Sequence, residues 1–505
     1  MIPVKRKVTA TQKGKTVMDR DIEEDESPTE VPSRSSHSVP ASEEHEGASA
    51  PALVPPVSPP GALGQQMIEA IQLLTQLVAA QAQRHGTGQA HTKFTIPLGS
   101  SLTANQETTR WLSHSRDFAF GFKQIQPQNQ FLLCIYYAKI KDTTIIWYAN
   151  DGYPVPRGSI VELNPQNGLI LGDPQGKMIW STSPIIACNV AYVVMNNTGN
   201  FVLVGSDSSV LWESFRYPTD TLLPTQILEI DDKLVSRKSE SLSVPGRFYL
   251  RMLSNGNLVL VTQSRPTNFD YDAEYYNSHT SDPGDEANSV YRLIFDELGS
   301  VYILKRNNQK LLLTPPNVPS ISENYHRLSL DFDGVLTHYY HPKSTTSTGN
   351  ERWSTLWSLP DNICLAILGE TGSGVCGYNN VCHLGENQRP YCVCPKGYSL
   401  TDPNNNYGNC KPKFIPSCDE FGKGNPEDLY DFDVVTDVDW PLSDFERIYP
   451  SAEEECRKAC LEDCFWAVAI YRSNSCWKKK LPLSNGRVDA TLNVKAFLKI
   501  RKVST

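Results

Sequence analysis

The chain has 505 residues, 39% of them hydrophobic, which is enough for several hydrophobic cores of domain size. Its formal net charge is −9 and it has no basic stripe, which argues against nucleic acid as a partner. Eleven of the thirteen cysteines fall between Cys364 and Cys476, a density that predicts disulfides made in an oxidising compartment. No cysteine pair has the C-x-x-C spacing of zinc sites, so neither a metal nor another cofactor is expected.

The segment 1–90 differs in composition from the rest of the chain. Most of it is low-complexity sequence that cannot bury enough apolar surface to offset its chain entropy, which predicts disorder. One amphipathic helix is expected near its end, because Ile68, Ile71 and Leu74 have helical spacing and Gly86 supplies a stop signal. This helix resembles the leader of plant retrotransposon gag polyproteins, and an ordinary linker helix is the alternative.

Residues 1–50 contain no apolar segment of the kind that follows the first residues of a secreted protein. No later run of 18 apolar residues occurs that would span a membrane. The sequence as written therefore predicts no signal peptide, no membrane span and a cytosolic location, in conflict with the clustered cysteines.

From Thr92 onward, short apolar runs alternate with Gly, Asn, Asp and Pro turns, which predicts an all-β region. A unit of strand, polar turn with glycine, and second strand recurs along this region. Because one hairpin cannot bury a face alone, several must pack about a shared axis. The turn glycines, which are expected to adopt positive φ, are Gly168, Gly199, Gly256, Gly299 and Gly334.

Two stretches are more specific, TTIIWYAND at 143–151 and WESFRYPTDTLLPTQ at 212–226. Both are similar to signature stretches of bulb-type, mannose-binding-like lectin domains in plant S-domain receptor kinases. KFTIPLGSSLTAN, which begins at Lys93, resembles the mature N-terminus of the G-type lectin receptor-like kinases of that family. The resemblance implies a mainly β chain with β-prism domains in tandem, each with three four-stranded sheets. A bulb-type lectin domain is expected at 91–228 and a second, degenerate copy at 229–355.

Bulb-type lectins hold mannose on a strand that reads Q-x-D-x-N-x-V-x-Y, whose polar residues hydrogen-bond the sugar and whose Val touches its apolar face. The corresponding slots of this chain keep Asn and Val in two repeats but lack the Tyr and the Gln–Asp pair. Each sugar hydroxyl left unpaired forfeits roughly 1 to 3 kcal/mol of binding free energy. The candidate carbohydrate-binding residues are Asn196, Thr198, Asn200, Val202, Asn255, Asn257 and Val259.

The simpler alternative is that these asparagines serve the β-turns. We therefore expect a carbohydrate other than mannose, or a glycoprotein, as the ligand. Asn196 also begins the sequon Asn196-Asn197-Thr198, which predicts N-glycosylation in the secretory pathway.

Residues 360–412 contain six cysteines and the stretch YCVCPKGY, and they resemble an EGF-like module. So short a segment needs cross-links for stability. Cysteine arithmetic alone leaves many connectivities open. The pairs that the resemblance implies are Cys364–Cys382, Cys376–Cys392 and Cys394–Cys410.

Residues 416–502 resemble a PAN/apple domain, a small α+β fold. SAEEECRKACLEDC at 451–464 predicts a helix with Ser451 and Glu454 as a capping box. Three cysteines are expected on one face of this helix, namely Cys456, Cys460 and Cys464.

The family usually has a further cysteine where this chain has Trp466. The resemblance implies the bond Cys456–Cys476. Cys418 is then expected to reach Cys464, which leaves Cys460 unpaired. Two cysteines on apolar strands of the lectin region are expected to be buried thiols, Cys134 and Cys188.

Motifs of common enzyme classes are missing: there is no HExxH, no G-x-S-x-G and no set of kinase motifs. GETGSG at 369–374 mimics a phosphate loop, but no Lys-Ser/Thr follows it. DFDG at 331–334 falls on the repeat as a hairpin turn.

The chain is therefore expected to be no enzyme but a binding protein like a receptor ectodomain, without the kinase of its parent family. Its expected ligand is a carbohydrate, a glycoprotein or another protein. Self-association through the EGF-like and PAN/apple regions is a further option. Two alternatives stay open: a non-functional fusion of a retrotransposon leader with a lectin-receptor fragment, and an incomplete membrane serine/threonine receptor kinase.

Overall fold

The structure is a computed structural model. The residues that it describes are 94–105, 109–125, 129–182, 189–264, 270–344, 351–367, 374–414, 418 and 424–502, with the backbone alone for 270–273. Every described residue belongs to one compact unit, Thr87–Thr505. The helix and the disorder expected within 1–90 lie outside the described residues, as does Cys188.

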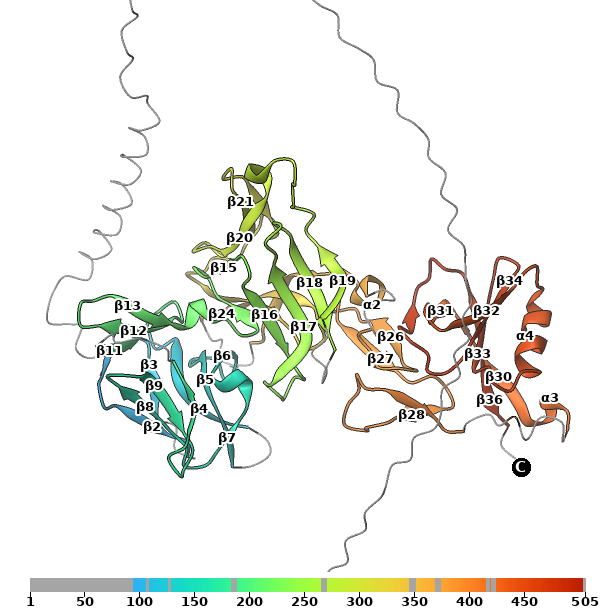
Figure 1. Cartoon of the computed structure of the whole chain (residues 1–505), viewed down its shortest axis with the longest axis horizontal. Coiled ribbons are helices and arrows are strands. Elements are labelled where there is room, and N and C mark those ends of the chain that lie inside the picture. The colour runs from blue at the N-terminus through green and yellow to red at the C-terminus, as the bar shows by residue number, and fades with distance from the viewer. Residues whose placement is uncertain are drawn as a thin grey trace, which may run out of the picture. The chain divides into compact units, whose positions relative to one another are not determined.

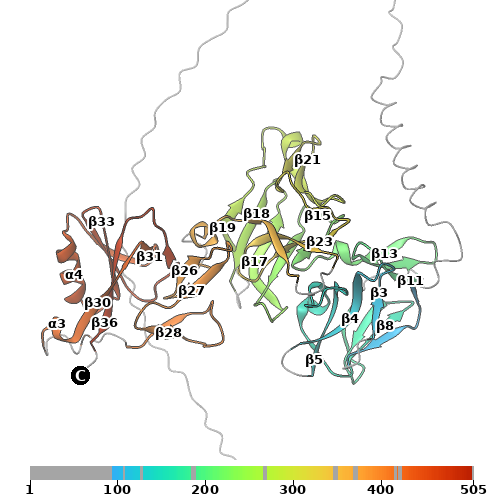
Figure 2. The same cartoon turned by 180° about the vertical axis from the view of Figure 1, so that it is seen from behind.

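Three antiparallel sheets form a first prism, coloured blue to green in Figure 1. One sheet contains β1 (Thr95–Pro97), β11 (Val190–Met195), β12 (Phe201–Gly205) and β13 (Val210–Glu213). A second contains β2 (Ser101–Thr103), β8 (Ile160–Asn164), β9 (Gly168–Gly172) and β10 (Met178–Ser181). The third contains β3 (Arg110–Leu112), β4 (Phe118–Ile125), β5 (Gln130–Tyr137), β6 (Ile145–Tyr148) and β7 (Val155–Pro156). Figure 2 shows β3, β4 and β5 side by side in this third sheet.

Each sheet of the first prism turns one apolar face to a common core, because successive side chains of a strand point to opposite faces. Phe120 of β4, Leu169 of β9 and Phe201 of β12 belong to one cluster and are fully buried. The rings of Phe120 and Phe201 stack with 4.2 Å between their centroids. Burying a side chain of this size stabilises the fold by about 1.5–3 kcal/mol. The shared hydrophobic core therefore holds the three sheets together.

A second prism follows, coloured green to yellow-orange in Figure 1. Its first sheet contains β14 (Thr221–Leu222), β23 (Asn324–Leu330), β24 (Leu336–Pro342) and β25 (Ser354–Leu359). Its second contains β15 (Ile227–Glu229), β20 (Val290–Phe295), β21 (Val301–Lys305) and β22 (Lys310–Leu312). Its third contains β16 (Lys233–Arg237), β17 (Pro245–Met252), β18 (Leu258–Gln263) and β19 (Asp270–Asn277). Short 3-10 turns in the two prisms are η2 (Asn150–Gly152), η3 (Ser214–Arg216) and η4 (Glu286–Asn288).

The second prism is more regular than the sequence suggests and begins earlier. All three of its sheets have four strands, although a degenerate copy was expected. The expected boundary between 228 and 229 falls inside β15, and the second prism already begins with β14, where Thr221 pairs with Ser329. β14 has only two residues, both buried, so it leaves no periodic pattern to detect.

The five turn glycines confirm the repeat. Their φ angles lie between 67° at Gly168 and 91° at Gly199, in the left-handed region that favours glycine. Gly334 has φ 89°, and an added Cβ would meet the ring of Phe248. Each hairpin thus depends on the residue at its turn.

Several side chains connect the two prisms. The hydroxyl of Tyr137 donates to the carbonyl of His326 at 2.8 Å. Trp353 Nε1 donates to Thr144 Oγ1 at 2.8 Å. These buried and half-buried contacts tie the third sheet of the first prism to the first sheet of the second.

A cysteine-rich module follows the second prism. Its elements are α2 (Ile363–Ala366), β26 (Val381–Leu384), β27 (Pro390–Val393), β28 (Tyr398–Leu400) and β29 (Cys410–Pro412). Three disulfides cross-link it, the same pairs that the resemblance implies: Cys364–Cys382, Cys376–Cys392 and Cys394–Cys410. Half-cystines of the first two pairs pack into the hydrophobic core of the second prism.

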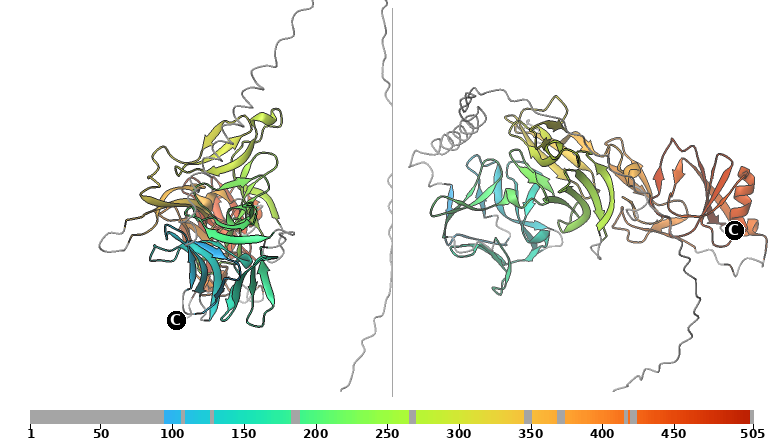
Figure 3. Two further views of the ribbon diagram at one scale, coloured as in Figure 1. Left: turned by 90° about the vertical axis from the view of Figure 1, so that its left-hand side faces the viewer. Right: turned by 45° about the horizontal axis from the view of Figure 1, so that its top comes forward.

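The C-terminal domain, residues 424–502, is built on a five-stranded sheet. In sheet order its strands are β30 (Tyr430–Thr436), β36 (Lys495–Arg501), β33 (Val468–Arg472), β34 (Ser475–Lys479) and β32 (Asp444–Ile448). The remaining elements are α3 (Pro426–Leu429), α4 (Glu453–Leu461), β31 (Val438–Asp439) and β35 (Arg487–Val488). Figure 3 shows α4 along one face of this sheet, where it contacts β33, β34 and β36.

The helix α4 starts one residue later than expected. Ala452 is its N-cap, and the Ala452 N–H donates to Glu455 Oε2 at 2.8 Å. Ser451 is buried instead and its hydroxyl donates to the Ala452 carbonyl, so it does not cap the helix with Glu454. Cys464 lies beyond the end of α4 and not on its face.

Two disulfides cross-link the C-terminal domain, Cys456–Cys476 and Cys418–Cys464. Cys460 is a buried free thiol, as expected from the missing family cysteine. Trp466, which stands in place of that cysteine, is fully buried beside Cys460 in the core between α4 and the sheet. Cys134 is likewise a buried free thiol, within the first prism.

Candidate carbohydrate-binding slots

Asn200 lies between the turn glycine of its repeat and strand β12, in the slot that resembles the mannose motif. Its Nδ2 donates to Glu213 Oε2 at 2.7 Å. Its Oδ1 accepts from Ser214 Oγ and from the Phe215 backbone N–H, both at 3.2 Å. Only 9% of the residue is exposed. Both polar atoms of the amide are thus bound within the protein, and Asn200 fastens the end of β13 to the turn.

Asn257 occupies the equivalent position before β18. Its Oδ1 accepts from the backbone N–H groups of Thr280 and Ser281, at 2.9 Å each. Its own backbone N–H donates to Asn255 Oδ1 at 3.0 Å, which closes a local turn. Asn255 itself is exposed. Both asparagines of this slot therefore hold backbone segments.

The two valines of the slots are buried. Val202 is 5% exposed and Val259 is fully buried. Val259 packs in a small cluster with Tyr249 and Val261. A valine that touches the apolar face of a sugar must be reachable from solvent, so neither side chain offers that surface.

Asn196 and Thr198 form the turn between β11 and β12. The Gly199 N–H donates to the Asn196 carbonyl at 3.1 Å, and Thr198 Oγ1 accepts weakly from the Asn200 N–H at 3.4 Å. Thr198 is exposed and Asn196 is half-buried. Among the described residues the Asn196 side chain has no hydrogen-bond partner, so this asparagine differs from Asn200.

A hydroxyl group fastens the hairpin in four of the repeats, which the sequence reasoning missed. In each case the backbone N–H at or near the start of the second strand donates to a Ser or Thr further along the chain. Three of the four pairs are 13 residues apart, and this spacing is the signal that could have revealed them. The pairs are Leu169 with Thr182, Phe201 with Ser214, Leu258 with Ser278, and Val301 with Thr314.

The polar turn between β23 and β24 is also occupied by the protein. Arg389 of the cysteine-rich module pairs with Asp331 at 2.9 Å and with Asp333 at 2.5 Å. Arg389 also donates to Thr337 Oγ1 at 2.9 Å. Burial raises the pKa of the Asp333 carboxyl to about 6, although the neighbouring Arg389 opposes that shift. The turn is thus a fastening point for the next module.

Within the ranges that the structure describes, no three His, Cys, Asp or Glu side chains gather as ligands for a metal ion. Among the described helices, none has the length and apolar character needed to cross a membrane.

A comparison with known protein families finds a match within the prisms. The sequence model of the family described as D-mannose binding lectin matches residues 144–243, which run from the third sheet of the first prism into the second prism. The described part of the chain is thus mainly β, and one stretch of it is similar to the D-mannose binding lectin family.

The chain is further related to plant G-type lectin S-receptor-like serine/threonine-protein kinases. It is 38% identical over 429 residues to LECRK2 of Oryza sativa subsp. indica, which covers 82% of this chain and 52% of that protein. It is 37% identical over 454 residues to RLK1 of Arabidopsis thaliana, which covers 86% of this chain and 52% of that protein. The chain thus spans about half the length of these curated relatives.

Solved structures add little. A monomeric monocot mannose-binding lectin from Gastrodia elata is 17% identical and covers 28% of this chain and 96% of its own, with a TM-score of 0.19. A TM-score this low supports no conclusion about the site.

Proposed function

We propose that the described part of the chain is a binding protein like a receptor ectodomain, which recognises a carbohydrate or a glycoprotein and performs no catalysis. Support comes from its prisms, from the matched lectin family and from relatives that are lectin receptor kinases by name. The observation that carries the finer proposal is the bonding of Asn200 and Asn257 within the protein. Mannose would have to break these bonds, so we propose a ligand other than mannose.

We also propose the domain assignment. The cysteine-rich module would be EGF-like and the C-terminal domain PAN/apple-like, with self-association through these two regions. The support is the agreement of four disulfides with the pairs that the resemblance implies, including Cys456–Cys476. A helix that a disulfide joins to a five-stranded sheet is also consistent with the PAN/apple proposal.

We propose an extracellular place of action, which the same bonds support. Five disulfides are formed between Cys364 and Cys476, and reducing compartments do not keep such bridges. The free side chain of Asn196 on an exposed turn supports N-glycosylation there.

Binding of the full chain to an array of glycans and glycoproteins tests the function. The chain is secreted behind an added signal sequence, and mass spectrometry verifies its disulfides. We expect binding to at least one glycan class or glycoprotein and no measurable binding to terminal mannose. Tight mannose binding that Asn200→Ala abolishes would restore the family site and contradict the proposal, and so would an array without any ligand.

A further inference from the structure

A small hollow opens in the C-terminal domain, on the face of the five-stranded sheet opposite α4. It measures about 70 Å³ and is lined by side chains of three strands of this sheet and of its surroundings. They are Ile470 and Arg472 of β33, Trp477 and Lys479 of β34, Asp444 of β32, Asp439 of β31, and Val494. Since a buried water needs about 10–15 Å³ of such space, the hollow has room for roughly five water molecules.

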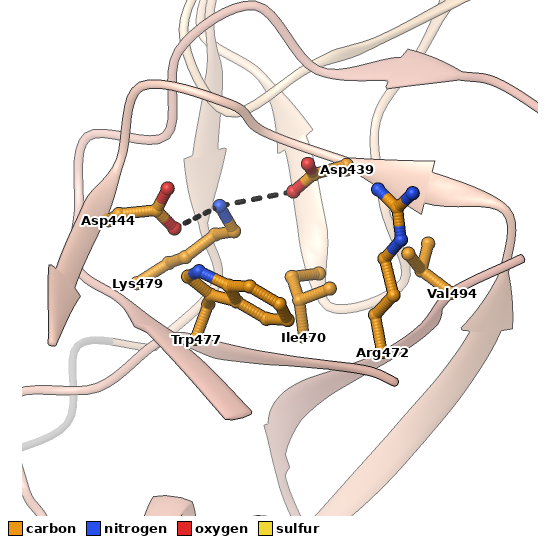
Figure 4. A pocket seen from close by; sticks show the side chains of 7 residues that line it. All are labelled: Asp439, Asp444, Ile470, Arg472, Trp477, Lys479 and Val494. Atoms are coloured by element: carbon orange, nitrogen blue, oxygen red, sulfur yellow. Dashed lines mark hydrogen bonds and ion pairs between the residues drawn. The ribbon is translucent and has the colours of Figure 1, made fainter. Parts of the chain in front are cut away.

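The hollow has a fixed polar wall. The Lys479 ammonium, 1% exposed, lies between two carboxylates, 3.0 Å from Asp439 Oδ1 and 2.5 Å from Asp444 Oδ1 (Figure 4). It also donates to the Trp440 carbonyl at 2.8 Å. Since Lys479 has three donors and all are used, it holds both carboxylates in place.

The outer oxygens of these carboxylates are available to a ligand. Asp439 Oδ1 additionally accepts the Trp440 N–H at 2.7 Å. Asp439 Oδ2 and Asp444 Oδ2 have no hydrogen-bond partner within the described ranges. Both residues line the hollow, so two acceptors on side chains of fixed position belong to its lining.

The rest of the lining offers donors and an apolar floor. Figure 4 shows Trp477 and Ile470 beneath the charged groups, with Arg472 and Val494 beyond Ile470. Arg472 is exposed at the end of β33, and its guanidinium makes no hydrogen bond or ion pair with any described residue. The Asp489 carboxylate interacts with Arg472 electrostatically but without a direct ion pair, which leaves the planar fork of N–H donors able to contact a ligand.

The charges of the lining side chains favour a neutral ligand over an ion. The carboxylates of Asp439 and Asp444 balance the cations of Lys479 and Arg472, so the lining has no formal net charge. An ion gains little Coulomb energy from such a lining. A hydroxyl group both donates and accepts, so neighbouring hydroxyls can donate to the carboxylates and accept from Arg472. The C–H face of a sugar ring would then lie on the apolar floor.

We propose that this hollow is a second saccharide site, which takes one terminal neutral monosaccharide of a glycan. Asp439 and Asp444 accept its hydroxyl protons, Arg472 donates to its oxygens, and Trp477 supplies the apolar platform. The site is separate from the slots of the prisms, and it does not depend on what the prisms bind.

Saturation-transfer NMR of the oxidised full chain tests the site with the methyl glycosides of mannose, glucose, galactose and N-acetylglucosamine. Nα-acetyl-lysine amide serves as a cationic probe. We expect at least one glycoside to bind. Arg472→Ala should weaken it by about tenfold to a hundredfold, the effect of losing hydrogen bonds to a charged group. Arg472→Lys, which keeps the charge but not the planar fork, should give an intermediate loss.

Arg157→Ala is the matched control, since Arg157 is exposed on the first prism and its side chain has no partner in the described part of the chain. The melting temperature of Arg472→Ala should stay near that of the parent chain, because the exposed side chain makes no hydrogen bond or ion pair with any described residue. Asn200→Ala should leave the glycoside signal unchanged, which separates this site from the prism slots. The proposal fails if no glycoside binds, if binding survives Arg472→Ala, or if only the lysine probe binds.

Discussion

Two buried histidines face each other in the second prism. His326 Nδ1 and His338 Nε2 lie 3.0 Å apart, and both residues are almost fully buried. Burial lowers the pKa of His326 to about 4 and that of His338 to about 3, because desolvation disfavours the charged ring. Both rings are therefore neutral in the folded protein near pH 6.

This pair predicts a loss of stability in mild acid. Unfolded histidines take up protons near pH 6.5, whereas the folded ones resist protonation until about pH 4. As the pH falls below 6.5, the unfolded state binds more protons and the free energy of unfolding decreases. The Asp333 carboxyl, with its pKa raised to about 6, acts in the opposite direction.

The variant His338→Gln isolates the contribution of the histidines, because glutamine keeps a polar group there and does not titrate. We expect the melting temperature of the parent chain to fall more between pH 7 and pH 5 than that of the variant. An equal fall of the melting temperature in the parent chain and in His338→Gln would contradict the role given to the two histidines.

The hairpin is the element on which both prisms are built. Gly334→Ala should destabilise the second prism for two reasons. The positive φ costs a residue with a Cβ about 1–2 kcal/mol, and the Cβ would also be forced against Phe248, at a further cost of about 1–3 kcal/mol. Chemical denaturation measures the change in the free energy of unfolding.

Gly176→Ala is the control for the backbone term, since Gly176 has φ 82° and an added Cβ would have no heavy atom within 4 Å. We expect Gly334→Ala to cost more than Gly176→Ala. Equal losses would mean that the Phe248 contact has no weight.

The hairpins and their turn glycines could be predicted because alternating apolar residues and turn residues both form local sequence patterns. The hydroxyls that fasten the hairpins could not be predicted, since Ser214 accepts the hydrogen bond of the Phe201 N–H from 13 residues away. The capping of α4 was misjudged by one position because Ser451 turns inward. Local patterns thus predict strands and turns, and they miss side chains that act across a fold.

At the scale of the whole molecule, one arginine connects the cysteine-rich module to the second prism. Arg389→Met should leave the Asp333 carboxylate, 2% exposed, without its partner. Removing one member of a buried ion pair costs about 3–5 kcal/mol. We expect a lower denaturation midpoint, with Arg157→Met as a control of equal chemistry at an exposed position. An unchanged midpoint would mean that the bridge does not support the junction.

The tandem order of lectin-like prisms before a disulfide-rich part could be predicted because signature stretches and cysteine density survive in the sequence. The role of the slots could not be predicted from the sequence. Whether Asn200 holds a sugar or Ser214 and Glu213 depends on the geometry of β13, which no local motif encodes.

We propose that Asn200 and Asn257 stabilise the prisms and do not bind mannose. The most direct measurement is the free energy of unfolding of Asn200→Ala and Asn257→Ala, with Asn406→Ala, an exposed asparagine of the cysteine-rich module, as the control. Each slot variant should lose about 1–3 kcal/mol, because buried groups that it now satisfies are left unpaired, while the control should stay near the parent value. Unchanged stability of both slot variants, together with mannose binding that they abolish, would contradict the claim.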